Sequence, residues 1–433
     1  MRLFRTQGRS ARQTEAKLTE LEQRGGSSLD TVLPTVRKIL REVRKQGDRS
    51  LLRYAQKFDG LAQESPLRVS PEETATAWQQ LDPALKQALE TATANIRAFA
   101  RRQLPQSWLS SIKGLSTGQL VRPIGSVGCY VPGGRHPLPS TMLMTVIPAQ
   151  VAGVRRIAVA SPRPALETLA TAHLLDVTEF YRIGGAHAIA ALTYGTESVP
   201  RVNKIVGPGN LYVTAAKREV AFDCSIDMLA GPTEIVVTSD QGTPQAIASD
   251  LVAQAEHDPE ALAILVTTSE PLALAVIEET KQRSRNNPVA RQALSSNGYI
   301  FLAASSEEAQ RITNRLAPEH LTVDSEADLK WVQNAGSVFI GNYSPQPMGD
   351  YISGPNHTLP TGGMAKVRGG LSVNDFVKLI TVQQYTAEGL AALGPQAIRI
   401  AEAEGLAGHA EAIHTRIEPQ TSVRAKSRKR GNA

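Results

Sequence analysis

Cysteine is almost missing from this chain of 433 residues. Only Cys129 and Cys224 occur, far apart and in no C-x-x-C pattern. Two isolated cysteines exclude a disulfide framework and a thiolate zinc site. Any bound metal ion must therefore use nitrogen and oxygen ligands.

Extended apolar stretches are missing as well. None reaches the roughly 18 apolar residues that a membrane-spanning helix requires. The first residues, Met1 to Arg5, lack the apolar core of a signal peptide. We therefore expect a cytoplasmic protein with no membrane partner.

The chain has little excess charge outside its end. The formal net charge is +6, but five positive residues lie in a tail without any acidic residue: Arg424, Lys426, Arg428, Lys429 and Arg430. Without them the chain is nearly neutral and has no basic stripe. We predict no nucleic-acid partner, and we expect residues 421–433 to form a disordered basic tail.

What the chain does contain is the pattern of an α/β protein. Hydrophobic residues make up 41% and charged residues 20% of the chain, which is typical of folded proteins. Short apolar runs alternate with helical stretches, and this rhythm predicts parallel sheets. The runs form two series, at 127–131, 156–160, 179–183 and 204–206, and then at 234–237, 263–267, 299–303 and 337–340. We expect two doubly wound parallel-sheet domains.

Around these domains we expect smaller segments. The predicted division is an N-terminal helical arm over 1–29, a discontinuous α/β domain over 30–129 and 232–370, a second α/β domain over 130–231, and a C-terminal helical domain over 371–420. A length of 433 residues is consistent with several domains.

The segment Gln254-Ala255-Glu256-His257-Asp258 is the first chemical candidate. It closes an amphipathic run from about Pro244, and a spacing of three places Gln254 and His257 on one helix face. Zinc binds imidazole and carboxylate oxygen, but Gln254 is a weak ligand, so a site would also need Asp350 and another histidine. A solvated helix end is the alternative, since imidazole is favourable near a helix C-terminus.

The adjacent pair Glu319-His320 is the second candidate. It lies just past Pro318, which should end the helix predicted over 306–316. Both side chains can then point into one cleft and serve as a general base and a water-activating group. A charged helix terminus explains the dipeptide equally well.

Glycine-rich turns follow two of the predicted strands, at Gly128 to Gly134 and at Gly207-Pro208-Gly209-Asn210. Strand exits of this kind let backbone amides approach phosphates. Neither run has the G-x-G-x-x-G pattern, so simple tight turns remain an alternative.

Taken together, these segments resemble the histidinol dehydrogenases, in matching order from about residue 30 to 416. The segments that carry the resemblance are Val131-Pro132-Gly133-Gly134, Gly184-Gly185-Ala186, Val206-Gly207-Pro208-Gly209-Asn210, Ala230-Gly231-Pro232, Gln254-Ala255-Glu256-His257-Asp258, Ala317-Pro318-Glu319-His320-Leu321, Gly349-Asp350-Tyr351 and Gly354-Pro355-Asn356-His357-Thr358-Leu359-Pro360.

The resemblance implies oxidation of L-histidinol to L-histidine, through L-histidinaldehyde, with two hydride transfers to NAD. It also implies two incomplete Rossmann-like domains in an intertwined homodimer, in which the C-terminal segment completes the active site of the partner. Zinc, one ion per subunit, would lie on residues matching Gln254, His257, Asp350 and His409.

The same resemblance assigns the other roles. His320 matches the base for the alcohol proton, Glu319 the group that activates water, and His357 a nearby supporting residue. The expected substrate contacts are Thr233, Gln254, His257, His320, Asp350, Glu404 and His409, and the expected NAD contacts are Tyr130, His187 and Asn210.

This sequence departs from the family pattern at three places. His187 stands where glutamine is usual, Thr233 where serine is usual, and Arg135-His136 where smaller residues are usual. Two alternatives therefore remain open. One is a related zinc- and NAD-dependent alcohol dehydrogenase with another polar substrate, and the other is a zinc-dependent hydrolase that uses Glu319 and binds no nucleotide.

Overall fold

The computed structural model describes residues 1–25, 29–133 and 137–417. It divides into two compact units, Met1–Leu104 with Pro123–Val377, and Pro105–Arg122 with Lys378–Ala433. The predicted disordered tail and the pair Arg135-His136 lie outside the described residues. Within the described ranges, no helix has the length and apolar character needed to cross a membrane.

The first unit contains a six-stranded parallel sheet. Its strands are β1 (Arg2–Arg5), β9 (Glu234–Thr238), β10 (Leu262–Thr267), β11 (Gly298–Leu302), β12 (His320–Val323) and β13 (Ser337–Ile340). They lie in the order β1-β11-β10-β9-β12-β13, and each neighbouring pair is parallel. The strand order reverses between β9 and β12.

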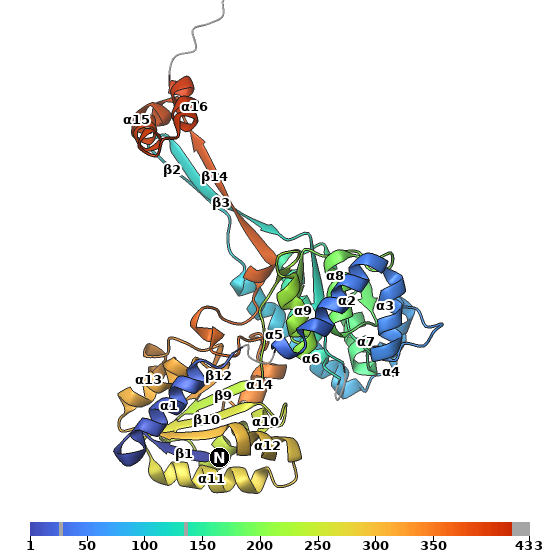
Figure 1. Ribbon diagram of the computed structural model, residues 1–433, viewed down its shortest axis with the longest axis vertical. Helices are drawn as coiled ribbons and strands as arrows, with labels where there is room; N and C mark the ends of the chain where they lie inside the picture. The colour runs from blue at the N-terminus through green and yellow to red at the C-terminus, as the bar shows by residue number, and fades with distance from the viewer. Residues whose placement is uncertain (26–28, 134–136, 418–433) are drawn as a thin grey trace, which may run out of the picture. The chain divides into compact units, whose positions relative to one another are not determined.

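Both faces of this sheet are covered, because successive strand residues point to opposite sides. On one face Ile235 and Val237 pack with helices α10 (Pro244–Ala255), α11 (Glu270–Arg283) and α12 (Pro288–Asn297). On the other, Val236 packs with α1 (Ala11–Glu22) and α13 (Ser306–Leu316), as can be followed in Figure 1. Burial on both sides explains the near-continuous apolar runs in the sequence.

A second parallel sheet has five strands. They are β4 (Ser126–Tyr130), β5 (Arg156–Ala160), β6 (Glu179–Tyr181), β7 (Lys204–Val206) and β8 (Ser225–Ile226), in the order β6-β5-β4-β7-β8. This order reverses between β4 and β7. Ligands of open α/β sheets bind beside such a reversal, outside the carboxyl ends of the strands.

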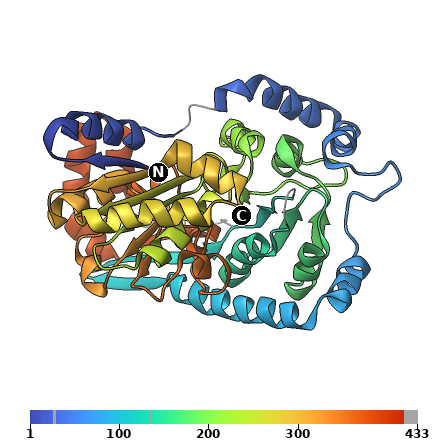
Figure 2. The same cartoon turned by 90° about the horizontal axis from the view of Figure 1, so that it is seen from below.

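Helices cover the second sheet on both faces too (Figure 2). One face carries α2 (Leu33–Gln46), α3 (Asp48–Tyr54), α8 (Gly185–Tyr194) and α9 (Leu211–Val220). The other carries α4 (Pro71–Gln80), α5 (Pro83–Gln103), α6 (Pro139–Ala152) and α7 (Leu166–Leu174). The two doubly wound sheets confirm the predicted fold class, whereas the predicted divisions near residues 130 and 231 stay a prediction because both sheets lie in one compact unit.

Two carboxylates close the carboxyl edge of the six-stranded sheet at its reversal. Asp324 accepts hydrogen bonds from the Ser239 hydroxyl and from the backbone N–H groups of Asp240 and Gln241. Asp240 accepts from the hydroxyl of Thr267 and from both the hydroxyl and the N–H of Thr268, each at 2.7 Å. The polar groups at the ends of these strands therefore form hydrogen bonds with one another.

The second unit is a small sheet with two helices. Strands β2 (Trp108–Ile112), β3 (Leu115–Pro123) and β14 (Val377–Tyr385) lie in the order β14-β3-β2, and β2 and β3 are antiparallel. Helices α15 (Ala387–Ala403) and α16 (Ala407–Ile417) pack on each other through Ile398, Ala401 and Ala410.

Three strands differ from the sequence-based expectation. Residues 1–29 contain the helix α1, but they begin with β1, which was predicted to be part of a helical arm. Likewise β14 occupies residues predicted to be helical within 371–420. Strand β12 was not among the predicted strands, because four residues after a proline are too few to show an alternating pattern.

Candidate active site

The predicted acid/base pair Glu319-His320 lies at the amino end of β12, beside the amino end of its neighbour β9. Thr233 directly precedes β9, and Glu319 directly precedes β12. The two strands are parallel and pair His320 with Ile235. This register places the start of β9 beside the Glu319-His320 dipeptide, so the structure brings Thr233, Glu319 and His320 together.

Glu319 is buried but well hydrogen-bonded. Its Oε2 atom accepts from the Thr233 hydroxyl at 2.6 Å and from the Glu234 N–H at 2.8 Å. Burial nonetheless dominates and raises the pKa of Glu319 to about 7, because a charged carboxylate loses solvation in the interior. A carboxyl group with this pKa can take up and release a proton near neutral pH.

His320 is held in one orientation by the backbone. Its Nδ1 atom lies 3.2 Å from the carbonyl oxygen of Glu234, so Nδ1 carries the hydrogen and donates it. The other ring nitrogen, Nε2, lies 3.7 Å from Asp350 Oδ1. Burial lowers the pKa of His320, but the neighbouring carboxylates of Glu319 and Asp350 outweigh burial and raise it overall.

An ion pair supports β9, the strand whose Glu234 carbonyl accepts the hydrogen bond from this histidine. Arg24 donates from Nε and Nη2 to the two carboxylate oxygens of Glu234, each at 2.7 Å. The Glu234 side chain also accepts from the Gly362 N–H. The backbone of Glu234, which binds both Glu319 and His320, is thereby fixed.

Gln254 and Thr233 form the next contact of the site. The amide nitrogen of Gln254, in the last turn of α10, donates to the Thr233 hydroxyl. Its amide oxygen, Oε1, is buried and has no hydrogen-bond partner among the described residues. Burying an acceptor without a hydrogen-bond donor costs free energy. We therefore expect this oxygen to bind a ligand.

Asp350 lies on the short helix α14 (Gln346–Tyr351), which packs against α10. Its Oδ2 atom accepts from Gln346 Nε2 at 2.7 Å. Burial raises the pKa of Asp350, but the hydrogen bond and the charge of His320 lower it overall, so the group is a carboxylate at neutral pH. Its backbone carbonyl accepts from Nδ1 of His357 at 2.8 Å.

His357 is therefore a neutral imidazole with a defined tautomer. The hydrogen sits on Nδ1, which leaves the lone pair of Nε2 available. Burial is the main reason that the pKa of His357 is lowered, and the charges of His320 and His257 lower it further.

His257 itself is not on the helix. Helix α10 ends at Ala255, and His257 lies in the exposed turn that follows. The expected shared helix face of Gln254 and His257 is therefore wrong. The cause is Pro259, which keeps Asp258 out of the helical region and ends the helix early.

Glu404 and His409 are not joined to these residues within one compact unit. Glu404 is the C-terminal cap of α15 and His409 lies in α16, and both are exposed side chains of the second unit. Within the described ranges, no group of three or more His, Cys, Asp or Glu side chains is arranged to hold a metal ion.

The donor atoms near Gln254 nevertheless suit zinc. The unpartnered Gln254 oxygen, the Asp350 carboxylate and nearby imidazole nitrogens form the kind of nitrogen and oxygen set that zinc accepts. Gln346 contributes a second buried amide oxygen without a partner in the described part of the chain.

Two of the residues expected to contact NAD, Tyr130 and Asn210, lie at the carboxyl edge of the five-stranded sheet. Tyr130 ends β4, and Asn210 caps α9 after the glycine turn that follows β7. The Tyr130 hydroxyl accepts from the Gly185 N–H at 3.1 Å, and burial raises the pKa of this tyrosine to about 12. Asn210 accepts from the N–H groups of Tyr212 and Val213, so its oxygen completes the first turn of the helix.

His187 is buried beneath this edge. Its Nε2 atom lies 2.7 Å from Oδ2 of Asp59, and the same oxygen accepts from the Gly184 N–H at 2.9 Å. Asp59 closes a π-helical turn, Ala55–Asp59, and the rings of Tyr54 and Phe58 pack around the histidine. His187 therefore holds the Gly184-Gly185 turn through Asp59.

Sequence reasoning missed two residues of these sites. Gln346 binds Asp350 at a spacing of four on one helix, and that spacing was a usable signal. Asp59 and His187 are 128 positions apart, and nothing in the local pattern links them.

Comparisons with known proteins place these residues in context. A family model described as Histidinol dehydrogenase matches residues 22–417. The curated histidinol dehydrogenase of Methanothermobacter thermautotrophicus is 46% identical over 416 residues, covering 93% of this chain and 97% of the relative. That of Listeria innocua is 45% identical over 422 residues, with 94% and 98% covered.

A solved structure gives the same result. The crystal structure of histidinol dehydrogenase from Elizabethkingia anophelis is similar with a TM-score of 0.90 and 35% identity, covering 96% of this chain and 98% of that one.

Proposed function

This chain belongs to the histidinol dehydrogenase family, and we propose that it oxidises L-histidinol to L-histidine in two steps, with NAD as the hydride acceptor. The observation that carries the proposal is the buried pair Glu319 and His320, held by Thr233 and Glu234 beside the unpartnered oxygen of Gln254. This pair offers a base for each of the two oxidations.

In the first oxidation, His320 takes the proton of the alcohol. Because its Nδ1 hydrogen is bound to the Glu234 carbonyl, the accepting atom is Nε2. As the proton leaves the hydroxyl oxygen, a hydride passes to NAD from the carbon that bears this oxygen. The alcohol thereby becomes the aldehyde. The resulting charge on the ring is stabilised by the Glu319 and Asp350 carboxylates.

In the second oxidation, Glu319 takes a proton from water. The hydroxide adds to the aldehyde carbon while the protonated His320 returns its proton to the carbonyl oxygen, which gives the hydrate. The hydrate then loses a hydride to a second NAD and a proton to the neutral His320, and the carboxylic acid that forms releases its remaining proton. The product is the carboxylate. A pKa of about 7 suits Glu319 for this task, since a large fraction is ionised at neutral pH while the group remains a useful base.

Substrate is held by the donor set around Gln254. We infer that Gln254, His257 and Asp350 of one subunit, with His409 of the partner subunit, would hold one zinc ion per subunit. When bound, zinc would supply a positive charge that fixes the imidazole and amine nitrogens of the substrate. Thr233 and Glu404 add hydrogen bonds to substrate, and His357 orients the site through the Asp350 carbonyl.

A homodimer with shared sites is part of the proposal. It is supported by the apolar side chains that the second unit leaves exposed, among them Trp108, Leu109 and Ile112 on β2, Leu379 and Ile380 on β14, and Ile400 on α15. Exposed apolar surface of this kind marks an interface. A partner copy that covers it also brings Glu404 and His409 to a site.

We propose that NAD binds at the carboxyl edge of the five-stranded sheet. Tyr130 and Asn210 lie there, and the glycine turns after β6 and β7 can admit a phosphate. His187 contributes from beneath by fixing the Gly184-Gly185 turn through Asp59. The cytoplasmic location expected from the sequence remains a prediction.

The direct test is purified, zinc-loaded protein with L-histidinol and NAD at mildly alkaline pH. We expect two NADH for each L-histidinol consumed, and the absence of NADH would refute the proposal. Specificity constants for other amino alcohols test the alternative substrate. A hydrolase is not retained, because the family is one of dehydrogenases; protection of the protein by NAD against thermal unfolding would agree with that conclusion.

A further inference from the structure

A buried ion pair that the proposed mechanism does not use lies at the cofactor edge. Lys217 on α9 contacts Asp227, which directly follows β8, and their side chains are only 3% and 0% exposed. Removing two charges from water is expensive, and an apolar pair of similar volume often stabilises a fold as well. Stability alone is therefore a weak explanation for this pair.

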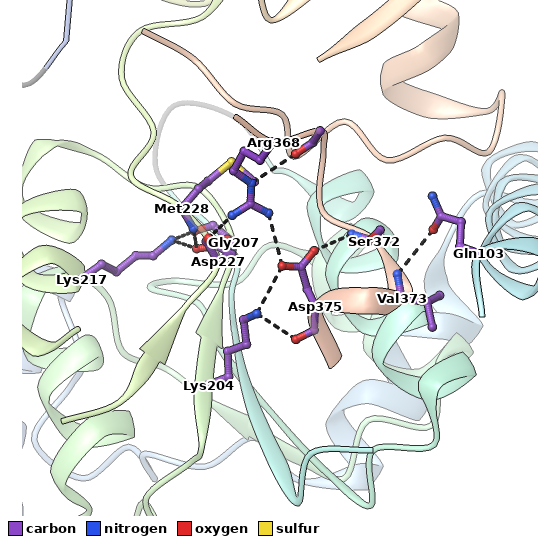
Figure 3. Close-up of polar contacts among 11 residues, drawn as sticks. Gln103, Lys204, Gly207, Lys217, Asp227, Met228, Arg368, Ser372, Val373 and Asp375 are labelled. Carbon is purple, nitrogen blue, oxygen red and sulfur yellow. Dashed lines mark hydrogen bonds and ion pairs between the residues drawn. The ribbon is translucent and has the colours of Figure 1, made fainter. Parts of the chain in front are cut away.

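The pair binds the main chain of one glycine from both sides. Lys217 Nζ donates to the carbonyl oxygen of Gly207 at 3.0 Å, and Oδ2 of Asp227 accepts from the Gly207 N–H at 2.8 Å. Figure 3 shows both side chains converging on Gly207. An apolar pair could not satisfy these two groups.

Gly207 needs this support because its conformation is unusual. Its φ angle is +111°, and a Cβ atom there would lie 2.1 Å from the carbonyl oxygen of Tyr130. The residue begins the turn Gly207-Pro208-Gly209-Asn210, which joins β7 to α9 at the strand-order reversal. The close approach to Tyr130 joins this turn to the end of β4.

A second cation, Arg368, extends the network to another part of the chain. Arg368 donates to the backbone carbonyl of Asp227 and, at 3.3 Å, to Oδ1 of Asp375. Lys204, the first residue of β7, donates to the Asp375 carbonyl at 2.8 Å (Figure 3). Both ends of the β7 segment are thus tied by buried or half-buried charges.

We propose that Lys217 and Asp227 are positioning residues of the cofactor site, which hold the Gly207–Asn210 turn in the form that accepts a pyrophosphate-bearing dinucleotide. The proposal rests on the proposed function, since it takes NAD as the dinucleotide. Neither side chain touches the dinucleotide. They act through the backbone of Gly207.

The test uses four variants of the full-length, zinc-loaded enzyme. Lys217→Met removes the donor to Gly207, and Asp227→Asn removes the opposite charge. The double variant Lys217→Met/Asp227→Asn leaves no unpaired buried charge, so it should be more stable than Lys217→Met alone. Arg218→Met is the matched control, because it removes a positive charge from the next residue of the same helix, where the side chain is partly exposed.

For each variant we would measure the dissociation constant of NADH, the KM values for NAD and L-histidinol, and the melting temperature. We expect Lys217→Met to raise both cofactor constants about tenfold or more while the KM for L-histidinol changes less than about twofold, since a displaced turn weakens only the group it positions. The double variant should melt at a higher temperature than Lys217→Met and still bind NADH weakly. Arg218→Met should match wild type.

Two results would overturn the inference. One is a double variant that regains wild-type NADH affinity together with wild-type stability. The other is a folded Lys217→Met variant with unchanged cofactor constants. If Lys217→Met does not fold, the double variant decides. A wild-type enzyme that binds NADH but does not oxidise L-histidinol would refute the proposed function and leave the NADH measurements on the variants as the test of this inference.

Discussion

Thr233 uses a single hydroxyl to join the base of the second oxidation to a proposed zinc ligand. Its hydrogen goes to Glu319, so its oxygen accepts from the amide nitrogen of Gln254. This arrangement fixes which end of the Gln254 amide is nitrogen and leaves the oxygen without a protein partner. Threonine can do this as serine would, because the extra methyl group takes no part in either bond.

We predict that Thr233→Val moves the pH profile of aldehyde oxidation to higher pH. Glu319 would lose a hydrogen bond that lowers its pKa, so its pKa would rise further above about 7. The active form is the carboxylate, so the rate rises with pH through this pKa. The measurement is the rate with L-histidinaldehyde against pH. Thr233→Ser is the control and should keep the wild-type profile; identical profiles for the two variants would contradict the prediction.

We predict that Glu319→Gln separates the two oxidations. Glutamine cannot take a proton from water, so the second step should slow by about 10²- to 10⁴-fold while the first continues. NADH formed per L-histidinol should fall from two towards one in single-turnover experiments. The exposed residue Glu256 offers the control Glu256→Gln. A Glu319→Gln enzyme that still yields two NADH at the wild-type rate would disprove the role.

The amino end of β12 carries the proposed acid/base residues, and the amino end of β9 holds them. The proposed cofactor site, in contrast, lies at the carboxyl ends of the five-stranded sheet. The motif Glu319-His320 could be found in the sequence because both groups are adjacent. Its location could not, because β12 is only four residues long and its pairing with β9 depends on residues more than 80 positions away. The long strands of both sheets were predictable, because a strand that is buried on both faces consists of nearly continuous apolar residues.

We predict that Gly207→Ala destabilises the fold by about 1–3 kcal/mol or more, because a side chain at this φ is strained and its Cβ would meet a backbone oxygen. Urea denaturation measures the change. Gly408→Ala in α16 is the matched control, since no atom lies within 4 Å of the added carbon. That variant should be stabilised by about 0.5–1 kcal/mol. Equal midpoints for Gly207→Ala and wild type would argue against the strain.

Helix α1 is tied to distant parts of the first unit by one carboxylate. Glu22 accepts from Arg315 on α13 at 2.7 Å and from Lys366 at 2.8 Å. The hydrogen bonds to Lys366 and then Arg315 lower the pKa of Glu22 from 4.5 to about 2. Because the folded pKa is depressed, its contribution to stability is present above pH 4.5 and is lost as pH falls towards 2.

We therefore expect Glu22→Gln to be less stable than wild type at neutral pH, with a difference that shrinks towards pH 2, where about half of the wild-type Glu22 is protonated. Unfolding free energies across this pH range measure the difference. Glu20→Gln, whose ion pair with Lys17 lies within α1, should change stability little at any pH. A constant gap between Glu22→Gln and wild type down to pH 2 would contradict the assignment.

Assembly can be tested on strand β2. Ile112 and Ser111 are neighbours on this exposed strand and point to opposite faces. We predict that Ile112→Asp weakens the dimer and lowers activity in proportion, because it places a charge in an apolar interface. Ser111→Asp is the control. Sedimentation and activity at several protein concentrations measure both, and a fully active Ile112→Asp monomer would refute a shared site.

The proposed dimer and the proposed role of His409 as a shared ligand could be inferred only from the family resemblance. A single chain carries no periodic signal of a residue that works in another subunit, and Glu404 and His409 lie in plain helical sequence. By contrast, Gln254 and Asp350 were recognisable as candidates because carboxamide, carboxylate and imidazole side chains recur in glycine- and proline-bounded segments. Residues that support a site from far away in the sequence could be identified only from the structure. Examples are Asp59, Lys217 and Asp227.

The closed carboxyl edge of the six-stranded sheet matters for engineering the enzyme. Asp240 and Asp324 accept hydrogen bonds from neighbouring residues at this edge. The amino ends of the same strands, at the opposite edge, hold Glu319 and His320. Four strand residues separate the two ends, roughly 13 Å at 3.3 Å per residue. The turn at Gln241-Gly242 is thus a natural place to graft a label or a surface linker, because the β-sheet itself insulates the proton chemistry from whatever is attached.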